Sequence, residues 1–180
     1  FSGNPIGMSI AVQAMTELVD KEYEVVRNAG FVGAILSTMI SSRRFKFIKE
    51  VRGRGLMIGV EFQHNMPVKA SDICLLLLER GLVTKPTHDN NIRIAPPLNS
   101  NKYLIWSIYE IINFVLSGLE ANYPSYSPQD EQTFNIFNTE QSNAEVKNYI
   151  DLKNGGKLNF NYAKENPLHK KYSEIISSHN

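Results

Sequence analysis

The stretch that says most about this chain is residues 91–98, which read Asn91-Ile92-Arg93-Ile94-Ala95-Pro96-Pro97-Leu98. An arginine stands between two isoleucines, in a short run that predicts a strand over Ile92–Ala95. The two prolines that follow cannot donate to a sheet ladder, so they end the strand and fix the path of the chain after it. A permanent cation inside an apolar strand needs a physical reason, and the flanking sequence has to supply it.

The residues on both sides of this strand predict short alternating elements. Upstream, a helix over Ala70–Arg80 ends at Gly81, which suits the residue after a helix C-cap. A strand over Leu82–Thr84 and a polar loop over His88–Asn91 follow it. Downstream, Asn99 or Ser100 is expected to cap a last helix over Tyr103–Leu119.

The first third of the chain predicts two helices and a hairpin. Asn4 is a good N-cap, and Pro5 suits the first helical position. A second helix is expected over Tyr23–Ile40, with a kink or restart near Gly30. Two β-rich runs, Phe47–Val51 and Leu56–Phe62, flank the Arg52-Gly53-Arg54-Gly55 segment, where glycines allow the positive φ of a turn.

These elements predict an α+β fold in which helices pack on a mostly antiparallel sheet over residues 1–119. We expect two apolar groups to form the core, namely the Leu75–Leu78 run and the helical stripe Ile105, Ile108, Ile111, Ile112 and Val115. Residues 120–180 differ in composition, being rich in Asn, Ser, Gln, Tyr and Lys with scattered apolar side chains. We interpret them as a polar tail or the start of another module, with no assigned role.

Composition excludes several classes of protein. The 180 residues carry a formal net charge of +1, so the basic stripe of a nucleic-acid binder is not expected. The only cysteine, Cys74, rules out a disulfide framework and favours a reducing compartment, the cytoplasm. Its place in an apolar run predicts a buried, inert thiol. No apolar run approaches the roughly 20 residues of a membrane span, so no membrane partner is expected.

The beginning of the sequence lacks an initiator methionine and a signal peptide, and it opens within a motif at Phe1-Ser2-Gly3-Asn4-Pro5. We therefore expect the chain to be a fragment whose N-terminal part is missing. If it is a eukaryotic protein, a mitochondrial matrix location remains open, since a transit peptide would lie in that missing part.

Three motifs resemble a known enzyme family in order and spacing. They are FSGNPIG at 1–7, VRGRGLMIGVEF at 51–62 and GLVTKPTHDNNIRIAPPLN at 81–99. Together they resemble the C-terminal part of a class III aminotransferase, a family that uses pyridoxal 5'-phosphate (PLP) and has the fold-type-I architecture. Within the family the resemblance is closest to enzymes that act on ornithine, chiefly through the Lys85-Pro86-Thr87-His88 stretch.

The resemblance implies a division of the chain and of the chemistry. Residues 1–22 would be the end of the large PLP-binding domain and residues 23–119 the small domain. The family's Schiff-base lysine would lie upstream of Phe1, so no catalytic residue is expected here and the fragment alone should be inactive. The family is dimeric, and Gly3 and Asn4 would approach the PLP phosphate across the homodimer interface, unless they only cap the helix.

Arg93 is the residue to which the resemblance assigns substrate binding, through the α-carboxylate. A guanidinium offers two parallel N–H donors to a carboxylate and keeps its charge when partly buried. From the pattern alone, a structural arginine whose head group reaches solvent at the sheet edge is the simpler interpretation. The resemblance favours the carboxylate, and the prolines then hold the base of the arginine rigid.

Other polar residues receive structural interpretations. Lys85 lies outside the family's lysine motif and is interpreted as a solvated or loop-fixing lysine. His88 is expected to hydrogen-bond within its loop, with a place at the active-site entrance left open. Arg52 and Arg54 are expected to belong to a solvated hairpin rather than to a phosphate or RNA contact. No cluster of Cys, His and carboxylates predicts a metal site.

The resemblance thus predicts a transaminase of ornithine or a similar ω-amino acid, with 2-oxoglutarate as amino acceptor. Acetylornithine or 4-aminobutyrate is the alternative substrate, because the strand motif LMIGVEF is shared across the class and cannot discriminate. A hypothesis of another class also stands, in which the small domain is a non-catalytic remnant or a scaffold fused to the tail.

Overall fold

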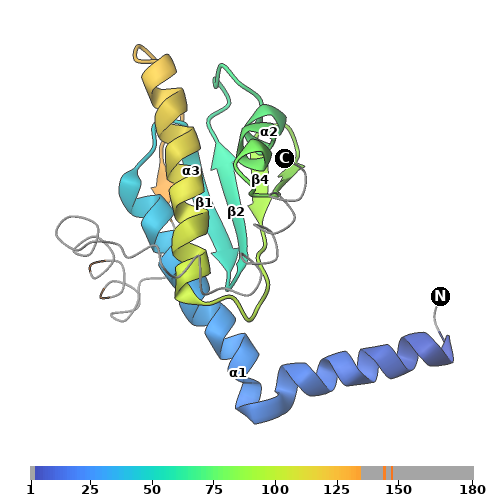
Figure 1. The fold of residues 1–180 in the computed structure, drawn as a ribbon. Helices are drawn as coiled ribbons and strands as arrows, with labels where there is room; N and C mark the ends of the chain where they lie inside the picture. Colours follow the sequence, from blue (N-terminus) through green and yellow to red (C-terminus); the bar gives the residue numbers. More distant parts are fainter. Residues whose placement is uncertain (1–2, 135–143, 145–146, 148–180) are drawn as a thin grey trace, which may run out of the picture. The chain divides into compact units, whose positions relative to one another are not determined.

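The computed structural model describes residues 3–134, 144 and 147 and shows helices packed on a sheet (Figure 1). The elements in chain order are α1 (Pro5–Arg43), β1 (Ile48–Arg54), β2 (Met57–Phe62), α2 (Ala70–Glu79), β3 (Lys85–Thr87), β4 (Asn91–Ile94), α3 (Lys102–Asn122) and β5 (Thr133–Phe134). All of them belong to one compact unit, Phe1–Ala144, and the rest of the predicted polar tail beyond β5, apart from residues 144 and 147, lies outside the described residues. The predicted α+β class is confirmed.

The sheet has the strand order β3-β4-β2-β1-β5 and is antiparallel except where β5 pairs with β1. Its centre is the β1–β2 hairpin, in which Arg54 pairs with Met57 across a two-residue turn. Within this turn Gly55 has a φ of +56°, a conformation that glycine adopts without the penalty of a Cβ atom. The predicted strand–turn–strand order is confirmed, but the turn is shorter than expected, because Arg52, Gly53 and Arg54 pair within the β1–β2 ladder.

Helix α1 approaches this hairpin turn backbone to backbone. A Cβ atom added to Gly33 would lie 2.1 Å from the carbonyl oxygen of Gly55, closer than any real contact between these atoms. The absence of a side chain at Gly33 is therefore what allows α1 to lie against the turn. This contact fixes the second half of α1 on the sheet.

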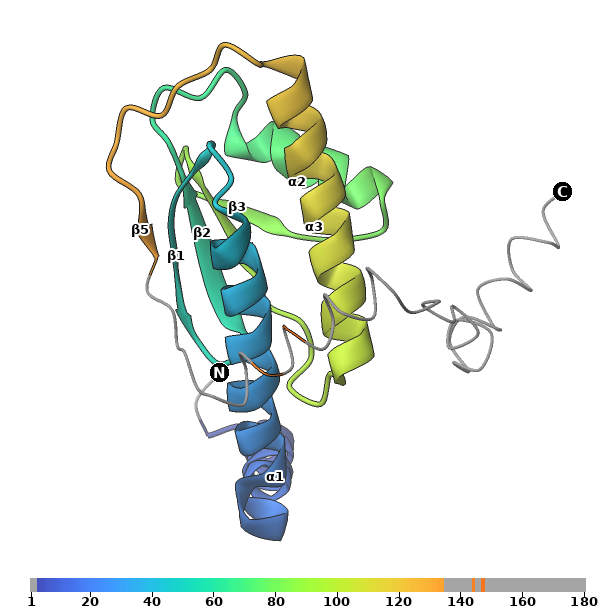
Figure 2. The same cartoon turned by 90° about the vertical axis from the view of Figure 1, so that its left-hand side faces the viewer.

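The three helices lie on one face of the sheet, as two perpendicular views show (Figure 1, Figure 2). The strands turn alternate residues toward them, and Ile58, Val60 and Phe62 of β2 are all buried. The helices and β4 complete the core, with the buried side chains Ile35, Leu36, Ile40, Ile92, Ile94, Ile105, Ile112 and Leu116. The other face of the sheet, called the outer face below, is not covered by any described helix.

The helix ends follow their sequence signals, with one shift. Asn4 caps α1, and its Oδ1 accepts from the backbone N–H of Ile6 at 3.0 Å. Gly81 follows α2 with a φ of +85°, as predicted. The cap of α3 is Asn101, which accepts from Leu104 at 2.9 Å, and not Asn99 or Ser100. The segment between Pro97 and Asn101 forms its own turn, since Ser100 hydrogen-bonds the Pro97 carbonyl instead.

Two predicted boundaries are wrong. Helix α1 is one element, and it changes direction at Tyr23, which has a φ of +63°, and not at Gly30 (Figure 1). Packing explains the position, because Ala29 and Val32 beside Gly30 are buried whereas Tyr23 is exposed. The strand expected over residues 82–84 begins three residues later as β3, and Val83 is 80% exposed.

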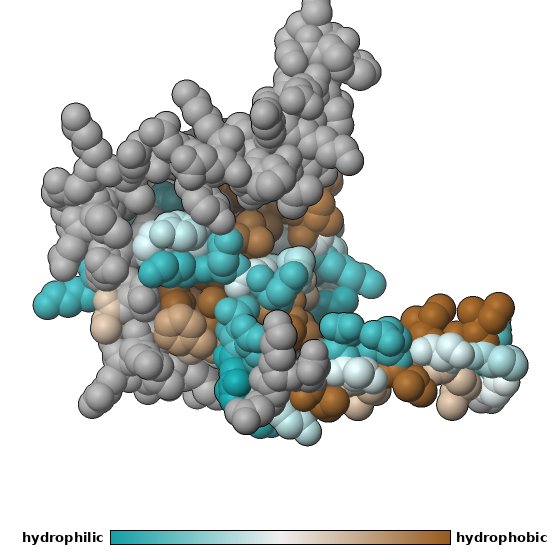
Figure 3. All heavy atoms as spheres, turned by 60° about the horizontal axis from the view of Figure 1, so that its bottom comes forward, coloured by the Kyte–Doolittle hydropathy of each residue, from teal (hydrophilic) through white to brown (hydrophobic). Residues whose placement is uncertain are grey.

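Part of the expected core is also on the surface. Leu75 and Leu78 of α2 are 59% and 51% exposed, while Leu77 is buried, because a helix can turn only one side of a continuous leucine run inward. The first part of α1 exposes most of its apolar side chains, and Figure 3 shows hydrophobic residues gathered along it. The exposed residues there are Ile6, Met8, Ile10, Val12, Met15 and Val19.

Residues 123–134, called the strap below, continue the fold beyond the predicted end of the small domain at residue 119. The ring of Tyr126 lies 4.4 Å from that of Phe47. Gln63 and Asp130 exchange two hydrogen bonds, of 2.8 and 3.1 Å. Gln132 Nε2 donates to the carbonyls of Phe45 and Ile48 at 2.9 and 2.7 Å. The strap thus ties β5 to the β1 edge.

Two helical segments, residues 23–43 of α1 and all of α3, are long and apolar enough to cross a membrane by length and hydropathy. About 61% of the first segment and 39% of the second are buried within the protein. Their buried sides contact each other and the sheet, and core helices of water-soluble folds give the same signal. Length and hydropathy alone therefore do not assign either helical segment to a membrane.

Candidate functional site

The outer face of the sheet carries two rows of side chains that run across four strands. Strand register pairs Arg52 with Gly59, Gly59 with Arg93, and Arg93 with Lys85. We call these four residues the cationic row. The next row toward the other end of the strands, the acidic row, consists of Glu50, Glu61, Asn91 and Thr87. Residues directly opposite in antiparallel strands share a face, so both rows project to the same side.

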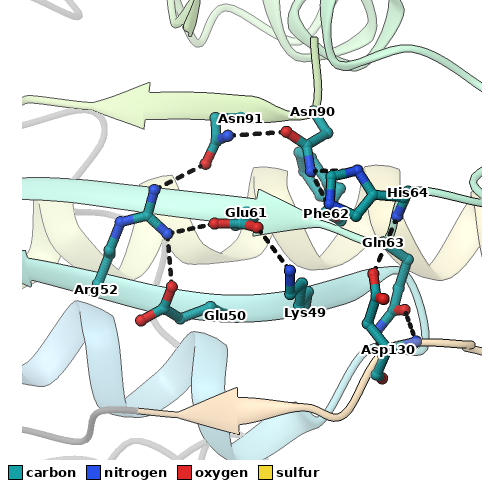
Figure 4. Close-up of polar contacts among 10 residues, drawn as sticks. All are labelled: Lys49, Glu50, Arg52, Glu61, Phe62, Gln63, His64, Asn90, Asn91 and Asp130. Carbon is teal, nitrogen blue, oxygen red and sulfur yellow. Dashed lines mark hydrogen bonds and ion pairs between the residues drawn. The ribbon is translucent and has the colours of Figure 1, made fainter. Parts of the chain in front are cut away.

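Arg52 is held by the acidic row (Figure 4). Its Nη1 lies 2.6 Å from Oε2 of Glu50 and 2.6 Å from Oε2 of Glu61. Its Nη2 donates to Oδ1 of Asn91 at 3.1 Å. Lys49 contributes a second cation, 3.1 Å from the other oxygen of Glu61. Both glutamates are therefore engaged within the sheet.

The ion pairs shift the titration of the groups that form them. The hydrogen bond from Arg52 lowers the pKa of the Glu61 carboxyl below its usual 4.5, and Lys49 acts in the same direction. The same bond from Glu61 raises the pKa of the Arg52 guanidinium, with Glu50 adding to it. Both shifts favour the charged forms, so this end of the cationic row is neutralised by protein carboxylates.

Arg93 differs from Arg52 although it stands in the same row. It is half-buried, and its side chain forms no hydrogen bond or ion pair with any residue that the structure describes. Across β2 its neighbour is Gly59, which has no side chain to reach it. The buried isoleucines on either side, Ile92 and Ile94, anchor the strand from the opposite face. The guanidinium is thus held by its backbone and left without an internal anion.

Lys85 lies directly opposite Arg93 on β3, the edge strand of the sheet. It is exposed, and in the described part of the chain its ammonium group has no hydrogen-bonding or ionic partner. Pro86 follows it, which suits an edge strand because Pro cannot donate to a further strand. His88 lies in the turn between β3 and β4, is exposed, and has a φ of +57°.

Gly3 and Asn4, predicted to approach a cofactor phosphate, form the start of α1. Gly3 has a φ of +84°, and a Cβ atom placed on it would have no neighbour within 4 Å. The Asn4 side chain is engaged as the cap of the helix. An exposed helix N-terminus with open space beside it fits an anionic group such as phosphate. The residues therefore fit one edge of a PLP phosphate site.

A metal centre and a reactive thiol are two other kinds of site that His, Cys and carboxylate residues can form. Over residues 3–134, 144 and 147, no three His, Cys, Asp or Glu side chains gather as metal ligands do. Cys74 is a free, buried cysteine, and burial raises the pKa of its thiol above the usual value. A raised pKa keeps the thiol protonated, which agrees with the predicted inert role.

The sequence analysis missed the pairing of Arg93 with Lys85 and that of Arg52 with the glutamates. Both follow from register. A hairpin centred on residues 88–90 places Lys85 and Arg93 opposite each other, and placing the strand at 82–84 hid this. For Arg52, a two-residue turn at residues 55–56 fixes the register of the β1–β2 hairpin. That register places Gly59 opposite Arg52 and Glu61 opposite Glu50.

Comparison with known proteins places the matched region in one family. The model of the class-III aminotransferase family matches residues 1–116. The ornithine aminotransferase of Brevibacillus brevis is 40% identical over 112 residues, covering 62% of this chain and 27% of that protein. The mitochondrial ornithine aminotransferase of Arabidopsis thaliana is 39% identical over 104 residues, covering 55% and 22%. The chain thus spans about a quarter of the length of these relatives.

Solved structures give the same result. Ornithine delta-aminotransferase of Plasmodium falciparum matches with a TM-score of 0.60 at 34% identity, over 67% of this chain and 31% of that one. Ornithine aminotransferase of Toxoplasma gondii, solved with partial occupancy of PLP at its active site, matches with a TM-score of 0.61 at 28% identity, over 68% and 29%. Acetylornithine aminotransferase of Elizabethkingia anophelis matches with a TM-score of 0.57 at 29% identity, over 64% and 29%. The strap lies beyond the family match.

Proposed function

The chain belongs to the class-III aminotransferase family, and from this premise we propose that the intact protein is a PLP-dependent transaminase that transfers the ω-amino group of ornithine to 2-oxoglutarate. The observation that carries the proposal is Arg93, a guanidinium in the matched region that pairs with no anion among the described residues. Relatives between 34% and 40% identical that are named ornithine aminotransferases support the substrate. Because the chain spans about a quarter of their length, the activity is proposed for the longer protein.

Arg93 binds a substrate carboxylate in this proposal. Its planar guanidinium gives two parallel donors, which fix the plane of the carboxylate as well as its position. The buried side of β4 and the prolines after it restrict the base of the side chain, so little freedom is lost when the substrate binds. Orientation of this kind brings the reacting amine and its C–H bond to one place at each turnover.

Gly3 and Asn4 contribute the second part of the proposal. The N-terminus of α1 presents its positive dipole end beside the open space at Gly3, where the cofactor phosphate would be held across a homodimer interface. Bound PLP supplies the electron sink for removal of a proton from the carbon that bears the amine. The lysine that carries the cofactor is expected in the upstream part of the longer protein, so the 180-residue chain alone should be inactive.

The exposed apolar side of the first part of α1 agrees with this arrangement. Six large apolar side chains between Ile6 and Val19 are exposed, an amount of apolar surface that usually marks an interface. We predict that residues 1–22 pack against the large domain of the intact enzyme. The division at residue 22 stays a prediction.

Acetylornithine is the second candidate donor, favoured by the likeness to acetylornithine aminotransferase of Elizabethkingia anophelis. Arg93 would bind the α-carboxylate of either donor, so the residues that choose between them are expected elsewhere in the longer protein. The two donors differ at the α-nitrogen, which carries a positive charge in ornithine and a neutral amide in acetylornithine. A direct comparison of the two as substrates therefore decides between them.

The test is a transamination assay on the full-length protein with PLP. Ornithine and 2-oxoglutarate should give glutamate and an ω-aldehyde, with kcat/KM at least about 10-fold above that for acetylornithine or 4-aminobutyrate, a difference of about 1.4 kcal/mol in transition-state binding. Glutamate is measured by coupled oxidation and the aldehyde by a trapping reagent. A higher kcat/KM for acetylornithine would show that acetylornithine, and not ornithine, is the amino donor. Absence of turnover with ornithine, acetylornithine and 4-aminobutyrate would support a non-catalytic protein.

A further inference from the structure

We propose that Lys85 is a second carboxylate-binding residue, and that Lys85 and Arg93 bind the same substrate carboxylate from opposite strands. The inference deepens the proposed function and rests on it for the identity of the ligand. It gives a role to a lysine that the sequence analysis interpreted only as solvated or loop-fixing. It also explains why the cationic row ends in two like charges.

Strand register places Lys85 and Arg93 next to each other on the outer face. Lys85 and Arg93 are direct partners in the antiparallel β3–β4 pair, so their Cα atoms are roughly 4.5–5.5 Å apart and their side chains leave the same face of the sheet. Both side chains are long, and their charged groups can therefore meet on one anion above the sheet. Thr87, two residues along, is opposite Asn91 in the acidic row, which confirms that the register holds along β3.

Lys85 and Arg93 are like charges that no described carboxylate neutralises. Two cations directly opposite each other on a sheet repel, and such a pair destabilises the fold unless an anion lies between or beside them. No carboxylate in the described part of the chain forms an ion pair with either residue. The carboxylates of the neighbouring acidic row, Glu50 and Glu61, are engaged by Arg52 and Lys49. An external anion is the partner that this arrangement lacks.

Lys85 and Arg93 lie at the edge of the sheet, next to a position that has no side chain. Gly59 occupies the cationic row between Arg52 and Arg93, so β2 places no side chain directly opposite the guanidinium, and the Arg52 side chain passes over this glycine to reach Asn91. On the other side the sheet ends at β3, and Lys85 approaches from that edge. The pair thus lies at the edge of the sheet with a glycine as its inner neighbour, so an anion can approach it from that edge.

A different explanation of Lys85 makes the opposite prediction. Lysines are common on edge strands because a charge there discourages pairing with the strand of another molecule. A lysine with that role alone could be replaced by any polar residue without affecting substrate binding. Measurement of KM and kcat separately distinguishes the two explanations.

The experiment compares three variants of the full-length protein. Lys85→Gln removes the charge, Lys85→Arg retains it, and Lys46→Gln removes an exposed positive charge that lies just before β1. We expect Lys85→Gln to raise KM about 3- to 10-fold for ornithine and for 2-oxoglutarate alike, with kcat within about twofold. Lys85→Arg should restore most of the affinity, and Lys46→Gln should leave both parameters unchanged.

Three results would overturn the inference. One is an unchanged KM in Lys85→Gln, which would leave Lys85 as an edge lysine. Another is a loss confined to 2-oxoglutarate, which would assign Lys85 to the distal carboxylate of the acceptor and not to the carboxylate bound by Arg93. An equal rise of KM in Lys46→Gln would show a general charge effect and would also overturn it.

Direct binding separates this inference from the proposed function. The affinity of 2-oxoglutarate for each variant is measured by calorimetry, which does not require turnover. If the wild-type protein binds it and Lys85→Gln weakens binding without any transamination, the carboxylate site stands and the enzymatic proposal fails. If the wild-type protein neither binds nor turns over, both fail. If it turns over and Lys85→Gln binds normally, only the role of Lys85 fails.

Discussion

Arg52 and Arg93 are two arginines of one cross-sheet row with opposite electrostatic settings. Arg52 contacts two glutamates and an asparagine, whereas Arg93 contacts no anion within the described residues. The two positions are separated only by Gly59. What distinguishes them is their use of the neighbouring row: Glu50, Glu61 and Asn91 all contact the Arg52 side chain, whereas no described residue of that row forms a hydrogen bond or ion pair with the side chain of Arg93 or Lys85. A charge is available for a ligand where the fold leaves it without a counterion.

This comparison also explains why a sequence motif around an arginine is insufficient to assign its role. Both arginines lie in strands with apolar neighbours, and each is followed within a few residues by Gly or Pro. The local sequence pattern is similar around both arginines, so the residues on the neighbouring strands determine whether each guanidinium has a counterion. The predictions below therefore exchange or remove the features that distinguish the two positions.

The largest effect is expected from Arg93→Met. Loss of the guanidinium should lower kcat/KM of the full-length enzyme by about 100-fold, since a charge-assisted, oriented interaction with the substrate is removed. Arg93→Lys should recover only part of this, because an ammonium cannot bind a carboxylate through two parallel donors. Steady-state kinetics with ornithine and 2-oxoglutarate measure both. Equal activity of the Met variant and the wild-type enzyme would contradict a carboxylate role.

The second prediction gives Arg93 the counterion that it lacks. Gly59→Asp places a carboxylate directly opposite it and should raise KM about 10-fold by competing with the substrate. Gly59→Ala is the matched control, because a Cβ atom at this position would meet only Arg52 atoms at 3.8 Å, an ordinary contact. The alanine variant should keep a normal KM. A similar change in both variants would point to steric disturbance instead.

The third prediction concerns the neutralised end of the row. Glu61→Gln removes the carboxylate shared by Arg52 and Lys49 and should lower the free energy of unfolding by about 1 kcal/mol, at the upper end for partly exposed pairs. The kinetic parameters should change by less than about twofold, since Arg93 is untouched. Chemical denaturation and steady-state kinetics measure the two effects. A large change in KM with unaltered stability would assign Glu61 to the substrate site.

The smallest expected effect is a pH dependence of the stability loss caused by Glu61→Gln. The pKa of Glu61 is lowered in the folded protein, so its contribution to stability is present above its unfolded pKa and is lost as pH falls through its folded pKa. The stability difference between wild type and Glu61→Gln should therefore be full at pH 7 and shrink below about pH 4.5. Urea denaturation at several pH values measures it. A difference that persists unchanged at the lowest pH would contradict the shift.

Much of the fold could be predicted from local signals. Asn4 and Gly81 were identified as helix ends, and Gly55 as a turn residue, because each acts through its own backbone or its nearest neighbours. The place of Arg93 on a short strand ended by prolines followed in the same way. The family resemblance then supplied a ligand that the pattern alone did not.

The features that were mispredicted depend on partners distant in sequence. Leu75 and Leu78 looked like core, but only contact with α3 and the sheet decides which side of α2 is buried. Val83 favours a strand by residue type, yet the pairing with β4 begins at Lys85. The strap is polar and seemed separate by composition, but its Asp130 hydrogen-bonds Gln63 and its Gln132 donates to the carbonyls of Phe45 and Ile48.

The central claim is that Arg93, and not Arg52, binds the substrate carboxylate. The most direct measurement is calorimetric titration of 2-oxoglutarate into the full-length wild-type protein, Arg52→Met and Arg93→Met under one buffer condition. The account predicts that Arg52→Met binds within about threefold of wild type and that Arg93→Met loses at least about 10-fold in affinity. Normal binding by Arg93→Met, or a loss confined to Arg52→Met, would contradict it.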